Sequence, residues 1–132
     1  MNTNRWVILG GAGFIGSHFV ELLISQGNYV VVVDNFTSGS MNHLANNKKS
    51  DLLQVINLDI KFTKKLATIL DSNDVVVHLA SNPDIARAQE DPRIDFIHGT
   101  VLTESVCEAA RMKNVKKIIY ASGSGIYKEN PK

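Results

Sequence analysis

Arg-Trp-Val-Ile-Leu-Gly-Gly-Ala-Gly-Phe-Ile-Gly, residues 5–16, is the stretch that decides the fold. Its apolar start predicts a buried strand over 5–9, and the periodicity that follows predicts a helix over 14–26, which Gly27 ends. The glycines between them fit G-x-G-x-x-G and also the wider G-x-x-G-x-x-G. Glycine allows a tight turn and a close approach of backbone to phosphate, and the helix start offers free N–H groups to an anion. The stretch therefore predicts a strand–turn–helix unit that binds a phosphate group.

The rest of the chain repeats this alternation of short apolar runs and helix-length segments. Further strands are expected over 29–33, 53–57, 74–79 and 117–121, helices over 63–70 and 94–113, and a polar loop with room for one short helix over 35–51. The first helix is expected to turn Phe14, Phe19, Leu22 and Leu23 toward the core. Apolar strands that alternate with helices are typical of a parallel sheet covered on both faces, and right-handed crossovers give the order 3-2-1-4-5. The sequence thus predicts one α/β domain over residues 1–132, a doubly wound Rossmann sheet.

Asp34 follows the second expected strand, 23 residues beyond Gly11. In dinucleotide-binding folds a carboxylate at this place accepts hydrogen bonds from the adenosine ribose. A carboxylate would repel the 2′-phosphate of NADP, and no arginine stands among the residues just after Asp34 to neutralise that phosphate. These features favour NAD as the cofactor. A plain structural turn beside a solvated carboxylate is the alternative interpretation.

The composition narrows the possible functions. Hydrophobic residues make up 44% of the chain and charged residues 20%, and the formal net charge is +1. The chain has no excess of basic residues that would indicate binding to nucleic acid. No apolar run is long enough to span a membrane or to form a signal peptide. The one cysteine, Cys107, cannot form an internal disulfide, which fits a cytoplasmic protein. No spacing of histidine, cysteine and carboxylate residues resembles a metal site.

Several motifs together resemble one family. They are residues 10–18, Asp34-Asn35-Phe36-Thr37-Ser38-Gly39, Leu58-Asp59-Ile60, residues 77–84, Asp91-Pro92, Glu108-Ala109-Ala110-Arg111 and residues 122–127. The set covers essentially the whole chain and resembles the extended short-chain dehydrogenases/reductases, in particular nucleotide-sugar epimerases and dehydratases of the UDP-glucose 4-epimerase type. The resemblance implies an NAD-binding Rossmann domain and a nucleotide sugar as the family substrate. It also implies that the chain lacks the C-terminal substrate domain from which two-domain relatives build most of the sugar pocket.

The resemblance implies cofactor contacts that run from the pyrophosphate to the nicotinamide. They are Gly10, Gly13, Phe14, Ile15 and Gly16 at the pyrophosphate, Asp34, Asn35, Ser38 and Gly39 at the adenosine ribose, Asp59 and Ile60 at the adenine, and Leu79, Ala80 and Ser81 on the path toward the nicotinamide. Within this set the backbone of Phe14 and Ile15 would hold the pyrophosphate, and Asp59 would accept from the adenine amino group. Leu9 stands where the family usually has threonine, which removes a hydroxyl while the turn is expected to survive.

The resemblance also implies the chemistry, in which NAD takes a hydride from a sugar hydroxyl while a tyrosine, tuned by a lysine four residues later, takes the proton. None of Tyr29, Tyr120 and Tyr127 has that lysine. The family's catalytic Ser or Thr falls on Gly123, and the neighbouring Ser124 is a candidate to replace it if the loop shifts. No catalytic residue is therefore assigned, and turnover by this chain alone is expected to be negligible. The alternatives are a non-catalytic, NAD-responsive interaction module and an enzyme fragment completed by another chain.

Other residues carry structural expectations. Gly99 lies where the family usually has asparagine, inside the long expected helix, and costs roughly 1 kcal/mol of helix stability relative to alanine. His78 is expected to be a hydrogen-bonded histidine at the end of a buried strand, and His43 an exposed polar residue. The fifth strand is expected to leave an unpaired edge that is open to another chain, so a homodimer or a complex with a partner chain is predicted.

Overall fold

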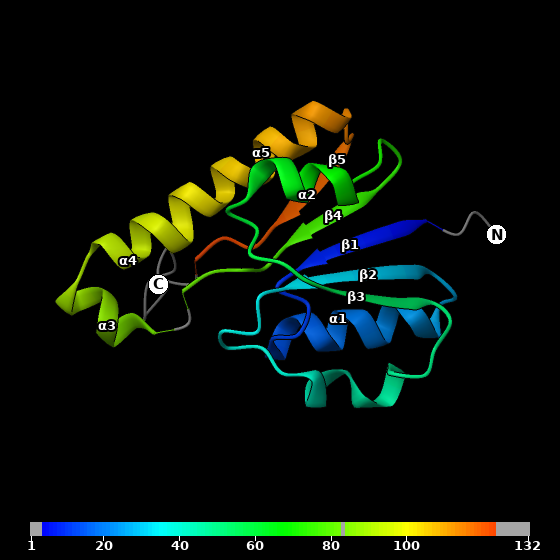
Figure 1. Ribbon diagram of the computed structural model, residues 1–132. Helices are drawn as coiled ribbons and strands as arrows, with labels where there is room; N and C mark the ends of the chain where they lie inside the picture. The colour runs from blue at the N-terminus through cyan, green and yellow to red at the C-terminus, as the bar shows by residue number, and fades with distance from the viewer. Residues whose placement is uncertain (1–3, 83, 124–132) are drawn as a thin grey trace, which may run out of the picture.

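The fold is a five-stranded parallel sheet with helices on both faces (Figure 1). The computed structural model describes residues 4–82 and 84–123. The strands are β1 (Arg5–Leu9), β2 (Tyr29–Asp34), β3 (Leu53–Asn57), β4 (Val75–His78) and β5 (Lys117–Tyr120). The helices are α1 (Phe14–Ser25), the 3-10 helix η1 (Met41–Asn47), α2 (Thr63–Ile69), α3 (Ile85–Glu90), α4 (Arg93–Asp95), the π-helix η2 (Phe96–Val101) and α5 (Leu102–Lys113). The strand order is β3-β2-β1-β4-β5, so the predicted Rossmann-type fold and its topology are confirmed.

β1 lies at the centre of the sheet, where the chain reverses its direction of progress across the strands. It pairs with β2 on one side and with β4 on the other, so that Leu9 lies level with Val33 and with His78. Because all the pairings are parallel, the carboxyl ends of the strands share one edge of the sheet. In such sheets ligands bind outside the carboxyl ends at the point of reversal. The fold thus places the candidate site at the end of β1.

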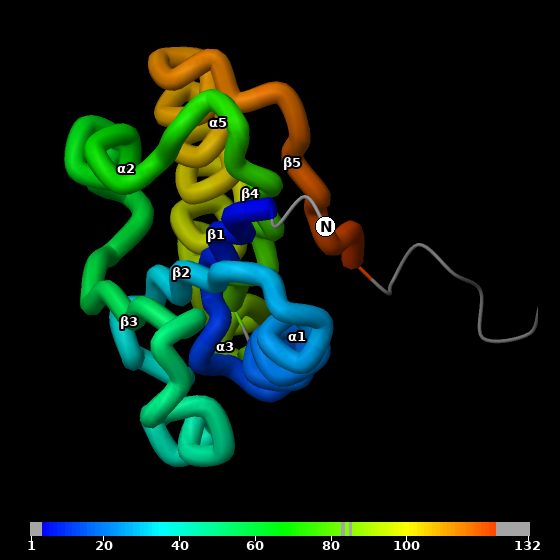
Figure 2. The backbone as a smooth tube through the Cα atoms, turned by 90° about the vertical axis from the view of Figure 1, so that its right-hand side faces the viewer, coloured from blue at the N-terminus to red at the C-terminus, as the bar shows by residue number. Residues whose placement is uncertain are grey.

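The sheet divides the core into two layers, which Figure 2 shows almost end-on to the strands. Side chains alternate along each strand, so Val7 and Leu9 face α2 and α5 while Ile8 faces α1 and η1. The layer under α2 and α5 includes Val31, Val33, Ile60, Leu66, Val76, Val106 and Ala109, and the layer over α1 and η1 includes Ala12, Val20, Leu23, Val30, Val32, Leu44 and Val77. Both faces of the central strands are therefore dry, which explains their continuous apolar sequences.

The inward face of α1 differs from the one predicted. Leu23 is buried and Phe19 half-buried, as expected, but Phe14 is 76% exposed and Leu22 54% exposed. The buried residues of this helix are Gly16, Ser17, Val20 and Leu23. Gly16 packs so closely on the preceding turn that it fixes which side of the helix meets the sheet, and at 3.6 residues per turn Phe14 and Leu22 then point away from it. The prediction for Phe14 and Leu22 was therefore wrong.

The segment before β5 contains more helix than the sequence predicted. The short helix α3 was not expected; the Asp84 side chain accepts a hydrogen bond from the Arg87 N–H (3.1 Å) at its start. The long helix is present, but α4, η2 and α5 follow one another from residue 93 to residue 113, with Gly99 inside the π-helical part. π-helical turns are often found at functional sites. The expected short helix in the polar loop corresponds to η1.

Candidate nucleotide-binding site

The turn after β1 is packed too closely for side chains. Gly10 has φ +84°, and a Cβ there would lie 2.8 Å from the Ala80 nitrogen. A Cβ on Gly11 would lie 2.8 Å from a methyl of Val32, and one on Gly16 only 2.3 Å from the Gly10 carbonyl oxygen. Real Cβ atoms essentially never come within 3.0 Å of such neighbours, so the glycines are needed for space. This packing holds the end of β1, the start of α1 and the segment after β4 against one another.

The start of α1 presents free backbone donors. Gly13 is the N-cap residue with extended backbone, and the first intrahelical bond runs from the Ser17 N–H to the Gly13 carbonyl (3.0 Å). Within the described part of the chain, the N–H groups of Phe14, Ile15 and Gly16 donate to no protein acceptor. The positive end of the helix dipole adds to these donors. The arrangement suits an anion, and the binding of a phosphate at this turn stays a prediction.

Asp34 is a buried carboxylate at the end of β2, only 8% exposed. Its Oδ2 accepts from the Ala12 N–H (3.0 Å) and its Oδ1 from the Phe36 N–H (2.8 Å). A Cβ on Gly39 would lie 2.9 Å from Oδ1, so the loop after β2 closes directly over the carboxylate. Each carboxylate oxygen can accept more than one hydrogen bond, which leaves capacity for a ribose hydroxyl. Asp34 thus fixes both the turn and its own loop, a role that the sequence did not predict.

The loop after Asp34 presents polar groups beside this carboxylate. Asn35 is exposed, and its Oδ1 accepts from the Thr37 N–H (3.1 Å). Phe36 has φ +57°, an unusual conformation for a bulky residue, and the bond from its N–H to Asp34 supports it. Ser38 is exposed as well. The predicted ribose residues therefore lie around one carboxylate, while their contact with a ribose stays a prediction.

Asp59, predicted at the adenine, lies just after β3 and is half-buried. Burial raises the pKa of its carboxyl, but hydrogen bonds from the Lys61 backbone and side chain, the Lys61 charge and a hydrogen bond from Asn35 together lower that pKa below its usual value. Lys61 Nζ is 3.0 Å from Oδ2. The carboxylate is therefore ionised and remains an acceptor. Ile60 is only 4% exposed and packs in the core, so its side chain contributes to the fold.

The segment after β4 also reaches the turn. The Leu79 N–H donates to the Leu9 carbonyl (2.9 Å), and Ala80 lies against Gly10, while Ser81 is exposed. The structure therefore places Leu79 and Ala80 at the switch point where a path toward a nicotinamide was predicted. Farther along this edge is an open hollow of about 370 Å³, lined by Gly99, Thr100, Thr103 and Tyr120.

His78 ends β4 beside this hollow and is buried. Its Nε2 is 3.4 Å from the Thr103 hydroxyl, and its ring centroid is 5.4 Å from that of Tyr120. Among the described residues Nδ1 has no hydrogen-bond partner. Burial lowers the pKa of the imidazole, so the neutral form is favoured. The expectation of a hydrogen-bonded histidine is met at Nε2 alone.

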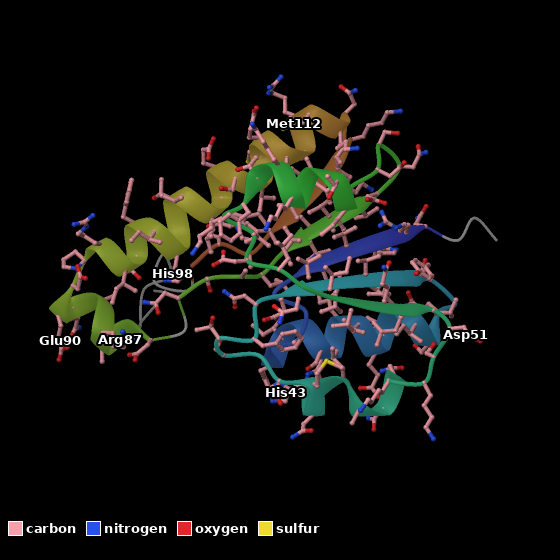
Figure 3. All side chains as sticks on the ribbon, in the orientation of Figure 1. His43, Asp51, Arg87, Glu90, His98 and Met112 are labelled. Atoms are coloured by element: carbon pink, nitrogen blue, oxygen red, sulfur yellow. The ribbon has the colours of Figure 1, made fainter. Side chains whose placement is uncertain are left out.

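His43 in η1 was predicted to be an exposed polar residue, and it is exposed. Its Nδ1, however, lies 2.7 Å from the Ala12 carbonyl oxygen, which also accepts from the Ser40 N–H (3.0 Å). Figure 3 labels His43 on η1, close to the start of α1. No sequence motif signals this contact, because His43 and Ala12 are 31 residues apart and only the fold brings them together.

The candidate catalytic residue Ser124, and with it Tyr127, lies outside the described residues. Gly123, which occupies the position expected for the family's hydroxyl group, is exposed. Among residues 4–82 and 84–123 no group of three histidine, cysteine or acidic side chains is arranged to hold a metal ion.

The comparison with protein families is decisive. The model of the NAD dependent epimerase/dehydratase family matches residues 6–132. The chain belongs to this family. NAD, the cofactor predicted from Asp34 and the glycines, is the cofactor of the family, and the predicted resemblance is confirmed.

Individual members of the epimerase/dehydratase family are similar over most of this chain. The UDP-glucose 4-epimerase of Mycolicibacterium smegmatis is 32% identical over 92% of the chain and 39% of its own length. The solved structure of the UDP-N-acetylglucosamine 4-epimerase of Methanobrevibacter ruminantium, in complex with UDP-N-acetylmuramic acid, is 35% identical with a TM-score of 0.87, over 99% of this chain and 41% of that one. The UDP-glucose 4-epimerase of Brucella ovis in complex with NAD is 28% identical with a TM-score of 0.79, over 89% and 35% of the two chains. The chain thus spans about two-fifths of the length of these relatives.

Proposed function

We propose that this chain binds NAD as the cofactor-binding part of a nucleotide-sugar epimerase or dehydratase. The observation that carries the proposal is that three amides without an acceptor among residues 4–82 and 84–123 lie at the same edge of the sheet as the buried carboxylate of Asp34. These amides belong to Phe14, Ile15 and Gly16. A dinucleotide needs both a donor-rich site for its pyrophosphate and an acceptor for its ribose. The glycine turn also fits a pyrophosphate, since its backbone is so closely packed that any Cβ on Gly10 or Gly16 would collide with backbone atoms.

In this proposal each group has one task. The amides of Phe14 and Ile15 hold the pyrophosphate, which the backbone at Gly13 approaches closely. Asp34 and Asn35 hold the adenosine ribose, with Ser38 and Gly39 next to them. Asp59 accepts from the adenine amino group, with Ile60 behind it in the core. Leu79, Ala80 and Ser81 flank the path to the nicotinamide. NAD, when bound, supplies a hydride acceptor.

We propose a nucleotide sugar as the substrate of the whole enzyme. The support is the family and the ligands of relatives: the Methanobrevibacter ruminantium epimerase is in complex with UDP-N-acetylmuramic acid, and the structure of the Thermotoga maritima UDP-glucose 4-epimerase contains UDP-glucose. Residues 4–82 and 84–123 contain no tyrosine that is followed four residues later by a lysine, and Gly123 has no side-chain hydroxyl. These 132 residues are therefore proposed to bind NAD without converting a sugar by themselves.

A partner chain or a second copy is the proposed complement. β5 pairs with β4 on one side, and all four of its residues are exposed, with Ile118 39%, Ile119 40% and Tyr120 56% exposed. Phe96, Ile97 and Met112 expose further apolar surface along η2 and α5. Among the described residues the other edge of β5 pairs with no strand, and such an edge with apolar side chains favours association with another chain. Light scattering at rising concentration measures this, and a constant monomer mass up to millimolar concentration would exclude self-association.

Calorimetric titration with NAD and with NADP tests the cofactor proposal. Binding of NAD and much weaker binding of NADP are expected, since the 2′-phosphate would meet the Asp34 carboxylate. Asp34→Asn should weaken NAD binding, and Asp51→Asn, which removes an equal charge at the far end of the sheet (Figure 3), should not. No NAD binding would refute the proposed function, and equal affinities for the two cofactors would refute the role of Asp34.

We also propose a cytoplasmic location. The support is the single cysteine, Cys107, which is a free, exposed thiol and fits a reducing compartment. Within the described residues the structure contains no helix that is both long and apolar enough to cross a membrane. Fractionation of cells that produce the chain tests the location directly.

A further inference from the structure

The glycine-rich turn between β1 and α1, called the phosphate turn below, is held at the peptide unit between Ala12 and Gly13. Its carbonyl oxygen, on Ala12, accepts from the Ser40 N–H (3.0 Å) and from Nδ1 of His43 (2.7 Å). Its N–H, on Gly13, donates to the Gly10 carbonyl (3.2 Å). Because a peptide unit is planar, groups that grip both of its ends fix its orientation. The next N–H along the chain is that of Phe14, the first donor of α1 that has no acceptor in the described part of the chain.

His43 reaches this peptide from a well-anchored support. It lies in η1, whose N-cap Ser40 accepts from the Asn42 N–H (3.2 Å) and whose neighbouring residue Leu44 is 1% exposed in the core below α1. The backbone N–H of His43 itself donates to the Ser40 carbonyl (3.1 Å). The imidazole is therefore aimed by the fold, although its outer surface is open to solvent. A carbonyl can only accept, so Nδ1 must carry the proton in this contact.

We propose that His43 is a positioning residue for the cofactor, which through its Nδ1–H holds the Ala12 carbonyl and so keeps the amides of the phosphate turn aimed at the pyrophosphate. The inference rests on the proposed binding of NAD. It adds to that proposal a residue that is not expected to touch the cofactor. This hydrogen bond is part-buried and joins two neutral groups, and because its acceptor belongs to the turn itself, its loss should change the geometry of the turn.

Two substitutions of nearly equal size separate the hydrogen bond from the shape of the side chain. His43→Asn places an amide nitrogen as many bonds from the backbone as Nδ1, and so can still donate to Ala12. His43→Leu has a similar branched shape and cannot donate. His43→Leu should weaken NAD binding about fivefold, the equivalent of one ordinary hydrogen bond, and His43→Asn should restore it. His98→Leu removes an exposed imidazole that makes no side-chain hydrogen bond among the described residues, and should leave NAD affinity unchanged.

Nuclear magnetic resonance of the chain without NAD tests the contact independently of the cofactor. The imidazole nitrogen shifts should identify the Nδ1–H tautomer at His43. Hydrogen exchange of the Gly13 amide should be faster in His43→Leu than in the wild type and should return to the wild-type rate in His43→Asn. The Nε2–H tautomer, or equal exchange rates in all variants, would overturn the inference.

The combined results distinguish the two possible failures. If the wild-type chain does not bind NAD, the proposed function fails and the cofactor role of His43 fails with it, whatever the resonance data show about the contact. If the wild type binds NAD and His43→Leu binds it equally well, only the role of His43 is refuted. Weak binding by both His43→Leu and His43→Asn would also refute it, because the donor would then not be the property that matters.

Discussion

Gly16→Ala adds one methyl group at the most closely packed of the described glycines. Alanine suits the backbone of a helix and would by itself stabilise α1 by about 1 kcal/mol. Its Cβ, however, would lie 2.3 Å from the Gly10 carbonyl oxygen and 2.7 Å from Gly11 Cα, where ordinary contacts begin at 3.4 Å. The obstructing atoms are backbone, so α1 must move about 1 Å from the turn. Overpacking of this kind costs about 3 kcal/mol, which leaves a net loss of about 2 kcal/mol.

Urea denaturation and thermal melting measure this loss, and calorimetry measures its effect on NAD. A net loss of about 2 kcal/mol should lower the melting temperature by about 8 °C in a domain of this size. NAD affinity should fall at least tenfold, since the displaced amides are the proposed pyrophosphate donors. Gly99→Ala is the matched control, because nothing lies within 4 Å of its Cβ and the substitution should raise stability by about 1 kcal/mol. Wild-type stability and affinity in Gly16→Ala would refute the packing argument.

Three further changes test other contacts. Burial lowers the pKa of His78 below 6.5, so on acidification the unfolded chain binds the proton before the folded chain does. The free energy of unfolding should therefore fall below about pH 6.5, by up to about 1.4 kcal/mol for each pH unit by which the folded pKa is lowered. His78→Gln should flatten that part of a urea-derived stability profile, and parallel profiles would contradict the assignment. Asp74→Asn removes a buried carboxylate that Arg5 contacts at 2.6 and 2.7 Å, and should cost about 2–3 kcal/mol in urea denaturation. Gly39→Ala puts a methyl 2.9 Å from the Asp34 carboxylate and should weaken NAD binding severalfold by calorimetry; an unchanged dissociation constant would show that the loop can yield.

The sheet and its order could be predicted because each strand carries its own signal. Apolar, β-branched runs such as 29–33 and 75–78 are long enough to be recognised locally, and crossover handedness leaves few topologies. The orientation of α1 could not be predicted in this way. Its inward face depends on a contact between Gly16 and Gly10, and hydrophobic periodicity alone assigned Phe14 and Leu22 to the wrong side.

The residues of the candidate site also differ in how far the sequence alone predicts them. The glycines and Asp34 are close enough in sequence, and regular enough in spacing, to form a recognisable motif. The contact of His43 and the lack of a partner for Nδ1 of His78 among the described residues have no such signal, because both environments are assembled from distant segments. The helix α3 was missed because only six residues form it and no apolar periodicity marks them.

The structural role of Asp34, beside its proposed role at the ribose, has a consequence for cofactor preference. A carboxylate at this position would exclude NADP by charge, and removing the charge is the obvious way to admit it. In this fold, however, the same carboxylate accepts the Ala12 and Phe36 N–H groups at 3.0 and 2.8 Å. A substitution such as Asp34→Ala would leave two amides without their acceptor, at about 1–3 kcal/mol each where they are buried, and would loosen the turn that must hold either cofactor. Relaxed preference should therefore come with weaker binding of both cofactors, unless another acceptor for Ala12 is supplied at the same time.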